Sequence, residues 1–129
     1  MVLDTSAMLA ILQDEPERDS FAEKIAAAAV CRISAASFVE ASMVLESRHG
    51  AEGVRLLDLL IESAGVDVVP VDLAQARIAR QAFADFGKGR HPAGLNYGDC
   101  FVYALARQLG EPLLCKGEDF SLTDLALVP

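Results

Sequence analysis

Five short, largely apolar segments alternate with longer segments of helical pattern along this chain. The segments expected to form strands are residues 1–4, 31–34, 66–70, 113–115 and 126–128. Strands that are separated by helices and carry almost continuous apolar runs are typical of a parallel sheet covered on both faces. We therefore expect an α/β fold of three layers, in which helices flank a central parallel sheet of four or five strands.

The helical pattern is clear enough to give approximate bounds for each helix. Helices are expected over residues 5–13, 17–29, 35–49, 51–64, 73–86 and 96–109. Gly50 and Gly65 are placed as carboxyl-terminal ends of helices, and the one long loop is residues 87–94. No Pro-, Gly- or Ser-rich tract divides the chain, so a single domain over residues 1–129 is expected.

Composition excludes several classes of protein. Hydrophobic residues make up 53% of the 129 residues, which is enough to bury a core. No apolar run reaches the roughly 18 residues of a membrane span, and Asp4 interrupts any signal-peptide pattern. Cys31, Cys100 and Cys115 have no C-x-x-C spacing and lie among apolar residues. We expect them to be small core residues of a cytoplasmic protein, not zinc ligands or disulfides.

Four carboxylates occupy places where an apolar segment ends or a helix begins. Asp4 and Asp119 follow expected strands, whereas Glu40 and Asp99 fall in the first turns of expected helices. In open parallel sheets, ligands bind in the crevice beyond the carboxyl ends of the strands. If the fold gathers the four acids there, they form a strongly negative pocket suited to divalent metal ions.

Glu40 and Asp99 also have structural explanations. Ser37 and Glu40 fit a capping box, although Ser34 directly ends the strand and is the better cap. Asn96 as a cap would place Asp99 at the third helical position, where a negative charge interacts favourably with the helix dipole. The apolar neighbours of both acids nevertheless favour partly buried carboxylates, which are costly unless they have a partner.

Asp4 and Asp119 are less specific when taken one at a time. Asp4 could be a simple helix cap and Asp119 a turn residue. The combination of four acids is more informative than any one of them. Mg²⁺ prefers oxygen ligands and keeps several waters, and one or two such ions can generate a hydroxide-like nucleophile and stabilise an in-line displacement at phosphorus. Mn²⁺ accepts the same ligands, and no Ser-His-Asp or Cys-His arrangement stands out.

The charge of the chain bears on its binding of nucleic acid. The formal net charge is -8 at pH 7, which argues against general electrostatic binding to phosphates unless bound cations offset the acids. Lys88, Arg90 and His91 cluster on a glycine-rich loop just before Asp99. They could contact the phosphates of a nucleic acid, although the loop could equally be a mobile surface connection.

Four blocks in a fixed order carry a family resemblance. They are Met1-Val-Leu-Asp-Thr-Ser-Ala7, Ser34-Ala-Ala-Ser-Phe-Val-Glu-Ala41, Gly87-Lys-Gly-Arg-His-Pro-Ala-Gly-Leu-Asn-Tyr-Gly-Asp-Cys-Phe-Val-Tyr-Ala104 and Pro112-Leu-Leu-Cys-Lys-Gly-Glu-Asp-Phe120. Together they resemble the PIN-domain ribonucleases, specifically the VapC-type toxins of toxin-antitoxin pairs. The resemblance covers essentially the whole chain, and the block from Gly87 to Ala104 is its most specific part.

The resemblance implies a PIN-like three-layer fold and a metal-dependent endoribonuclease site. It assigns catalysis and Mg²⁺ binding to Asp4, Glu40, Asp99 and Asp119, and it gives the hydroxyl of Ser6 a supporting role. Glu118 stands beside Asp119, so which of the two points inward stays open at this stage.

Partners are implied in the same way. A VapB-like antitoxin is expected to lay an apolar helix along a groove and to push an Arg or Lys into the acid cluster. Helices 22–29 and 54–61 are candidates for that groove or for the face of a homodimer. RNA is the expected substrate.

Two other classes of function remain open. The first is a phosphatase or phosphotransfer domain, which would use Asp4. A haloacid-dehalogenase-type phosphatase requires a second Asp two residues later, where this chain has Ser6. A receiver domain requires paired acids near the first strand and a Lys near the end of the domain. Lys116 matches that Lys only loosely. A non-catalytic PIN-like module could instead use its acids to bind a basic peptide.

Overall fold

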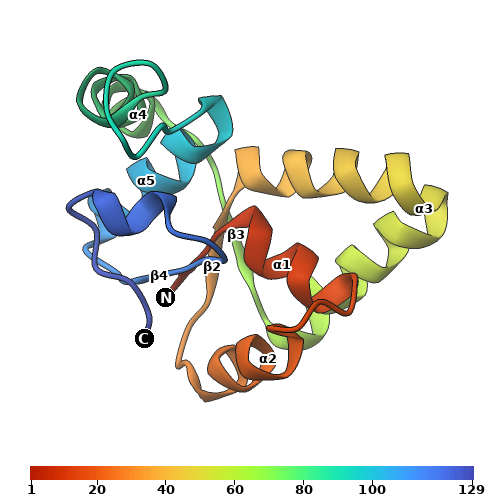
Figure 1. Cartoon of the computed structure of the whole chain (residues 1–129). Helices are drawn as coiled ribbons and strands as arrows, with labels where there is room; N and C mark the ends of the chain where they lie inside the picture. Colours follow the sequence, from red (N-terminus) through yellow and green to blue (C-terminus); the bar gives the residue numbers. More distant parts are fainter.

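A four-stranded parallel sheet lies at the centre of the computed structural model, which describes all 129 residues (Figure 1). The strands are β1 (Val2–Leu3), β2 (Arg32–Ser34), β3 (Asp67–Val69) and β4 (Leu113–Leu114), in the order β3-β2-β1-β4. Val2 of β1 is paired with Arg32 on one side and with Leu113 on the other, and every pairing is parallel. The first strand of the chain is therefore an inner strand, with both of its edges occupied.

The segment expected as a fifth strand is reduced to a single bridge. Leu127 is paired with Leu113 in parallel, and the Leu113 nitrogen donates to the Ala126 carbonyl at 2.9 Å while the Val128 nitrogen donates to the Leu113 carbonyl at 2.9 Å. Residues 126–128 thus lie along the outer edge of β4 without forming a strand. The expectation of four or five strands is met by four.

The helices agree with the expected bounds to within about two residues, apart from one pair. They are α1 (Thr5–Leu12), α2 (Arg18–Ala27), α3 (Ala35–Ala64), α4 (Leu73–Phe86) and α5 (Tyr97–Leu109), followed by the short 3-10 helix η1 (Asp119–Leu122). The expected helices 35–49 and 51–64 are the two arms of α3, which runs away from the sheet and turns back at Gly50 (Figure 1). Gly50 has φ 64° and ψ -153°, a conformation that is accessible to glycine and rare for other residues.

Each face of the sheet is covered by its own hydrophobic cluster. One cluster joins β1 and β4 to α4 and α5 and includes Val2, Leu105 and Leu113. The other joins the sheet to α1, α2 and α3 and includes Leu3 and Ile33. Because successive side chains of a strand point to opposite faces, adjacent residues of β1 enter different clusters. This burial on both sides explains the apolar character of β1, β2 and β4, whereas the edge strand β3 is largely exposed. The two clusters confirm the three-layer α/β arrangement.

None of the helices combines the length and the hydrophobicity that crossing a membrane requires. The three cysteines are free thiols, with Cys31 and Cys100 buried and Cys115 half-buried.

Candidate active site

Asp4 lies at the point where β1 ends and α1 begins. Its backbone nitrogen donates to the Leu114 carbonyl at 3.0 Å, and its Oδ2 accepts from the Ser6 nitrogen at 3.1 Å, which caps α1. The residue is only 7% exposed. Burial raises the pKa of Asp4, the hydrogen bonds from Ser6 oppose this rise, and the charge of Glu40 adds to it. The carboxylate therefore caps a helix and is also a buried acid close to a second acid.

Ser6 joins two distant parts of the chain at this point. Its hydroxyl donates to Asp4 Oδ2 at 2.5 Å and accepts from the Lys116 nitrogen at 2.9 Å. The segment that follows β4 is thereby attached to the segment that follows β1. The position of the Asp4 carboxylate depends on a hydrogen bond that links both strand ends.

Glu40 projects from the second turn of α3, and its carboxylate packs against Gly98. The cap of α3 is Ser34, whose hydroxyl accepts from the Ala36 nitrogen at 3.2 Å, so the capping box with Ser37 is not formed. Glu40 is half-buried. A Cβ atom added to Gly98 would lie 3.1 Å from Glu40 Cδ and 3.3 Å from Oε1, and closer still to Oε2. The absence of a side chain at Gly98 makes room for the Glu40 carboxylate.

Asp99 serves as a helix cap and at the same time lies among the other acids. Its Oδ2 accepts from the Asn96 nitrogen at 3.0 Å, and its own nitrogen donates to Asn96 Oδ1 at 2.9 Å, which is a complete capping box. Burial raises the pKa of Asp99 to about 6, against the effect of the Asn96 hydrogen bond, and the charges of Asp4, Glu40 and Asp119 contribute to the rise. The structural and the electrostatic interpretations of this acid both hold.

Asp119 is the most exposed of the four acids and is the first residue of η1. Its charge raises the pKa of Asp99, and the charges of both Asp119 and Glu118 raise the pKa of Cys115. The Oε2 atom of Glu118 lies 3.4 Å from the Ser121 hydroxyl. Asp119 therefore stands close enough to Asp99 for its charge to act on that carboxyl group.

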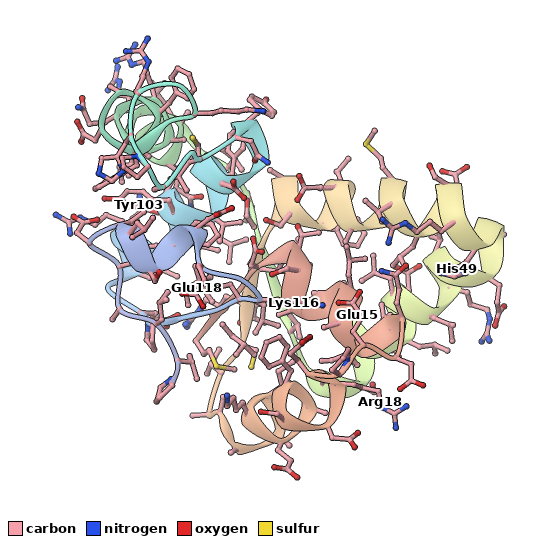
Figure 2. All side chains as sticks on the ribbon, viewed as in Figure 1. Glu15, Arg18, His49, Tyr103, Lys116 and Glu118 are labelled. Atoms are coloured by element: carbon pink, nitrogen blue, oxygen red, sulfur yellow. The ribbon has the colours of Figure 1, made fainter.

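No basic side chain neutralises these acids. The protein has eight ion pairs, and none of them includes Asp4, Glu40, Asp99 or Asp119. Lys116 is the nearest basic residue in sequence to Asp119, but its Nζ binds Glu15 at 2.8 Å (Figure 2). The same Nζ lies 3.2 Å from Glu17. The cluster is therefore a region of uncompensated negative charge.

The Cys115 thiol borders the cluster without joining its chemistry. Burial raises the pKa of Cys115 to about 11, and the charges of Asp4 and Asp119 add to that effect. The thiol consequently stays protonated at neutral pH and is not a nucleophile. The donor atoms left at the site are carboxylate oxygens.

The donor set fits a hard divalent cation in an open site. In this structure no group of three or more His, Cys, Asp or Glu side chains is arranged so that it could by itself hold a metal ion. Mg²⁺ is usually held by one or two carboxylates, with waters and substrate phosphates completing its shell. Four uncompensated carboxyl groups that stand near one another match this requirement better than they would match a closed protein cage.

The three basic residues of the 87–94 loop are placed differently from the acids. Lys88 and Arg90 are exposed, and the Arg90 guanidinium lies 5.0 Å from the centre of the Phe83 ring. His91 Nδ1 accepts from the Ala93 nitrogen at 3.0 Å, and its ring meets Phe86 edge-on at 5.1 Å. None of the three is among the charges that shift the pKa of Asp4 or Asp99. The loop is held in shape by His91 and lies outside the acid cluster.

Gly98 is a residue of the site that was not expected from the sequence. The signal was present in the dipeptide Gly98-Asp99 in the first turn of an expected helix. A glycine at such a place is unfavourable for the helix itself, which points to a close approach of another group. Only the tertiary structure identifies that group as Glu40.

The fold and the acid cluster define an α/β domain with an acidic site beyond the carboxyl ends of its strands. The sequence model of the family described as PIN domain matches residues 1–125 of this chain. The chain is 52% identical over 128 residues to Ribonuclease VapC30 of Mycobacterium tuberculosis, covering 99% of this chain and 98% of that protein. This chain belongs to the PIN-domain family, among the VapC ribonucleases.

Solved structures agree on the fold. The crystal structure of VapC20 from Mycobacterium tuberculosis, described as a sarcin-ricin loop cleaving toxin, has a TM-score of 0.81 at 18% identity, over 98% of this chain and 97% of that one. VapBC2 from Rickettsia felis, bound to a DNA fragment from its promoter, has a TM-score of 0.78 at 12% identity, over 98% and 96%. The expected PIN-like fold is thus confirmed.

Proposed function

We propose that this protein is a metal-dependent endoribonuclease and the toxin of a VapBC-type pair. It would hydrolyse RNA phosphodiester bonds at a site made by Asp4, Glu40, Asp99 and Asp119. The strongest support is the gathering of these four acids, without any basic partner, beyond the ends of the strands. The names of the similar proteins support RNA as the substrate.

The residues of the chain divide the work in this proposal. The four acids hold Mg²⁺, or Mn²⁺ in its place, and Ser6 fixes the Asp4 carboxylate through its 2.5 Å hydrogen bond. The bound ion would supply an activated water and Lewis-acid stabilisation of the charge that develops on the phosphate. A bound cation would also offset the repulsion between the four acids and the phosphate at the cleavage site. Metal would therefore strengthen RNA binding there, while contacts made away from the acids would not require it.

The exposed loop supplies contacts to the RNA backbone. Lys88 and Arg90 are free to reach phosphate oxygens, since neither forms an ion pair. His91 uses Nδ1 as an acceptor, which leaves Nε2 as the donor that can face a phosphate. These contacts would position the strand without selecting its sequence.

The phosphotransfer alternative finds less support. An Asp4 nucleophile would have to be accessible, whereas the residue is 7% exposed and its Oδ2 is occupied by Ser6. A receiver domain would need Lys116 beside that acid, but its amine binds Glu15 and Glu17. A non-catalytic module that binds a basic peptide through the acids is the remaining rival.

A cleavage assay separates the nuclease from this rival. Labelled single-stranded and structured RNAs are incubated with the protein in Mg²⁺, in Mn²⁺ and in chelator. Cleavage is expected with metal only, and Asp4→Asn, Glu40→Gln and Asp99→Asn should each lower the rate by about 10²-fold or more, with a smaller loss for Asp119→Asn. Circular dichroism shows whether the variants fold. Cleavage that persists in chelator, or that is lost only together with folding, contradicts the proposal.

The surface of the protein has a groove in which an antitoxin of VapB type could bind. An apolar groove of about 400 Å³ lies between α2 and the ends of α1 and α3 and is lined by Ile11, Ile25, Ala26 and Leu60, among others. An amphipathic helix fits such a groove, and a basic side chain next to it would compete with the metal for the acids. Ala26 is exposed, so Ala26→Arg should block the groove without unfolding the protein. If the antitoxin still co-purifies with the Ala26→Arg variant, this groove is not the antitoxin-binding site.

We also propose a homodimer in the cytoplasm. The free thiols are compatible with a reducing compartment. Large apolar side chains on α3 are exposed, with Val39 at 53% and Met43 at 64%, which favours a buried contact in an assembly. Light scattering after gel filtration measures the mass directly, and a monomer at micromolar concentration would refute the dimer.

A further inference from the structure

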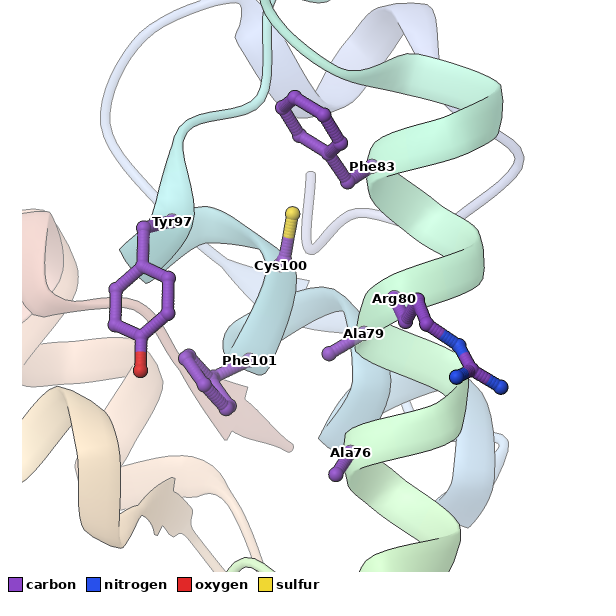
Figure 3. A pocket seen from close by; sticks show the side chains of 7 residues that line it. All are labelled: Ala76, Ala79, Arg80, Phe83, Tyr97, Cys100 and Phe101. Carbon is purple, nitrogen blue, oxygen red and sulfur yellow. The ribbon is translucent and has the colours of Figure 1, made fainter.

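An apolar cavity opens between α4 and α5, next to the acid cluster. Its volume is about 400 Å³, within the range of about 300–1,000 Å³ usual for small-molecule sites. Ala76 and Ala79 of α4 face Tyr97 and Phe101 of α5 across it, and Phe83 closes one end (Figure 3). The proposed catalytic acids do not line it.

The rim of this cavity presents aromatic rings to solvent. Tyr97 is 81% exposed and meets Phe101 edge-on at 4.8 Å, and Phe83 is 41% exposed beneath the Arg90 guanidinium. Tyr97 is the first residue of α5 and makes no hydrogen bond that would require its ring at this position. Exposed flat rings of this kind are the surfaces on which single-stranded nucleic acids stack their bases.

Unpaired positive charge is concentrated on α4 and on the loop that follows it. Of the eleven Lys and Arg residues, five form ion pairs, namely Arg18, Arg32, Arg55, Arg107 and Lys116. Four of the remaining six lie on α4 or on the loop after it, namely Arg77, Arg80, Lys88 and Arg90. In a chain of net charge -8, a local excess of free cations is suited to a polyanion.

The cavity and the acid cluster are formed in part by neighbouring residues of the chain. Tyr97, Gly98 and Asp99 are consecutive, and Gly98 packs against the Glu40 carboxylate. The stem of Arg80 lines the cavity, while its guanidinium extends away from the rings to the outside of α4 (Figure 3). A strand whose phosphate lies at the acids would therefore bring a neighbouring base to Tyr97 and a further phosphate to α4.

We propose that this cavity is a nucleobase subsite, in which an unpaired base of the RNA stacks on Tyr97 beside the scissile phosphate. The inference rests on the proposed nuclease function and adds to it a preference for single-stranded substrate. Arg80 and Arg90 contact the backbone of the same strand. A protein segment is the less suitable occupant, because the free cations around the cavity match phosphates and find no counterpart in an apolar helix.

The test is a binding measurement in chelator, where no cleavage occurs. Fluorescence anisotropy compares labelled oligouridine and oligoadenosine with an abasic oligomer of the same length. Wild type should bind at least one base-bearing probe more tightly than the abasic one. Tyr97→Ala should weaken that binding by about 5- to 100-fold, the range expected for one stacked base, and should leave abasic binding unchanged. Tyr97→Phe, which keeps the ring, should bind as wild type does.

Leu109→Ala is the matched control, because Leu109 is an exposed apolar residue at the other end of α5; it should not alter binding. Equal affinity of wild type for base-bearing and abasic probes would overturn the subsite. So would a change of oligomeric mass in Tyr97→Ala with base-dependent binding intact, which would assign the face to self-association.

Wild-type cleavage in Mg²⁺ is measured in parallel with binding. Base-dependent binding without any cleavage refutes the proposed nuclease and leaves the subsite standing. Cleavage with base-independent binding refutes the subsite alone.

Discussion

Gly98 of α5 lies directly against the carboxylate of Glu40 on α3. A Cβ at Gly98 would stand 3.1 Å from Glu40 Cδ, so the two helices present an acid and an empty position to each other. This contact joins the acids of two helices, and it makes the position of Glu40 sensitive to a single methyl group.

Gly98→Ala is predicted to reduce cleavage without unfolding the protein. The added methyl group displaces the Glu40 carboxylate, whereas alanine favours the helix by about 0.5–1 kcal/mol over glycine. Activity should fall by about 10- to 100-fold, as for other losses of metal-site support, while the melting temperature stays level or rises. In a Glu40→Gln background the same change should cost no further activity. An unchanged rate for Gly98→Ala would show that the Glu40 carboxylate need not lie at this contact.

Ser6→Ala is predicted to loosen the Asp4 carboxylate. The hydroxyl makes two hydrogen bonds, to Asp4 and from the Lys116 nitrogen, so its loss should cost about 1 kcal/mol of stability in urea unfolding. Cleavage should fall by about 10- to 100-fold. Ser42→Ala is the control, since the Ser42 hydroxyl donates to the Phe38 carbonyl at 2.7 Å within α3. If both variants lose the same activity, Ser6 does not position the Asp4 carboxylate for cleavage.

The stability of the metal-free protein is predicted to depend on pH through Asp99. Its folded pKa of about 6 lies above the ordinary value of 3.8, so folding favours the protonated form. The contribution of this group is fully present below about pH 4 and is lost as pH rises through about 6. Asp99→Asn does not titrate and should become more stable relative to wild type over that interval. The gain should be about 1–2 kcal/mol after allowance for solvent screening of this partly exposed group.

Urea unfolding at a series of pH values in chelator measures this difference. The quantity of interest is the free energy of unfolding of Asp99→Asn minus that of wild type. It should rise between about pH 4 and 7 and then level off. A difference that is flat across this range, or that falls, would mean that folding does not raise the pKa of Asp99.

Removal of the loop cations is predicted to weaken RNA binding uniformly across sequences. Each phosphate contact contributes about -0.7 to the slope of log affinity against log salt for single strands. Lys88→Gln and Arg90→Gln should therefore each make the slope shallower by about 0.7. Lys24→Gln removes another cation that has no ion pair, on α2, and should leave the slope unchanged. If all three variants share one slope, the 87–94 loop does not hold phosphate.

Several parts of the site could be predicted because they depend on local chemistry. Asp4 and Asn96 cap helices in which their own neighbours supply the donors. For Asp99 the sequence left two interpretations, a capping residue and a member of the acid cluster, and the structure contains both. The direction of the Lys116 side chain could not be predicted, because its partners Glu15 and Glu17 are about a hundred positions away in the chain.

The sequence by itself determined the three-layer class of this protein, since strands buried on both faces must be apolar throughout and helices must carry their own caps. It also determined the family, through blocks of residues that can be read in order along the chain. Only the tertiary structure decided that Glu40 meets Gly98, that the charge of Asp119 acts on Asp99, and that Tyr97 lines a cavity beside them. Those relationships arise from the packing of α3, α4 and α5, whose contacts join residues far apart in the chain and leave no local pattern.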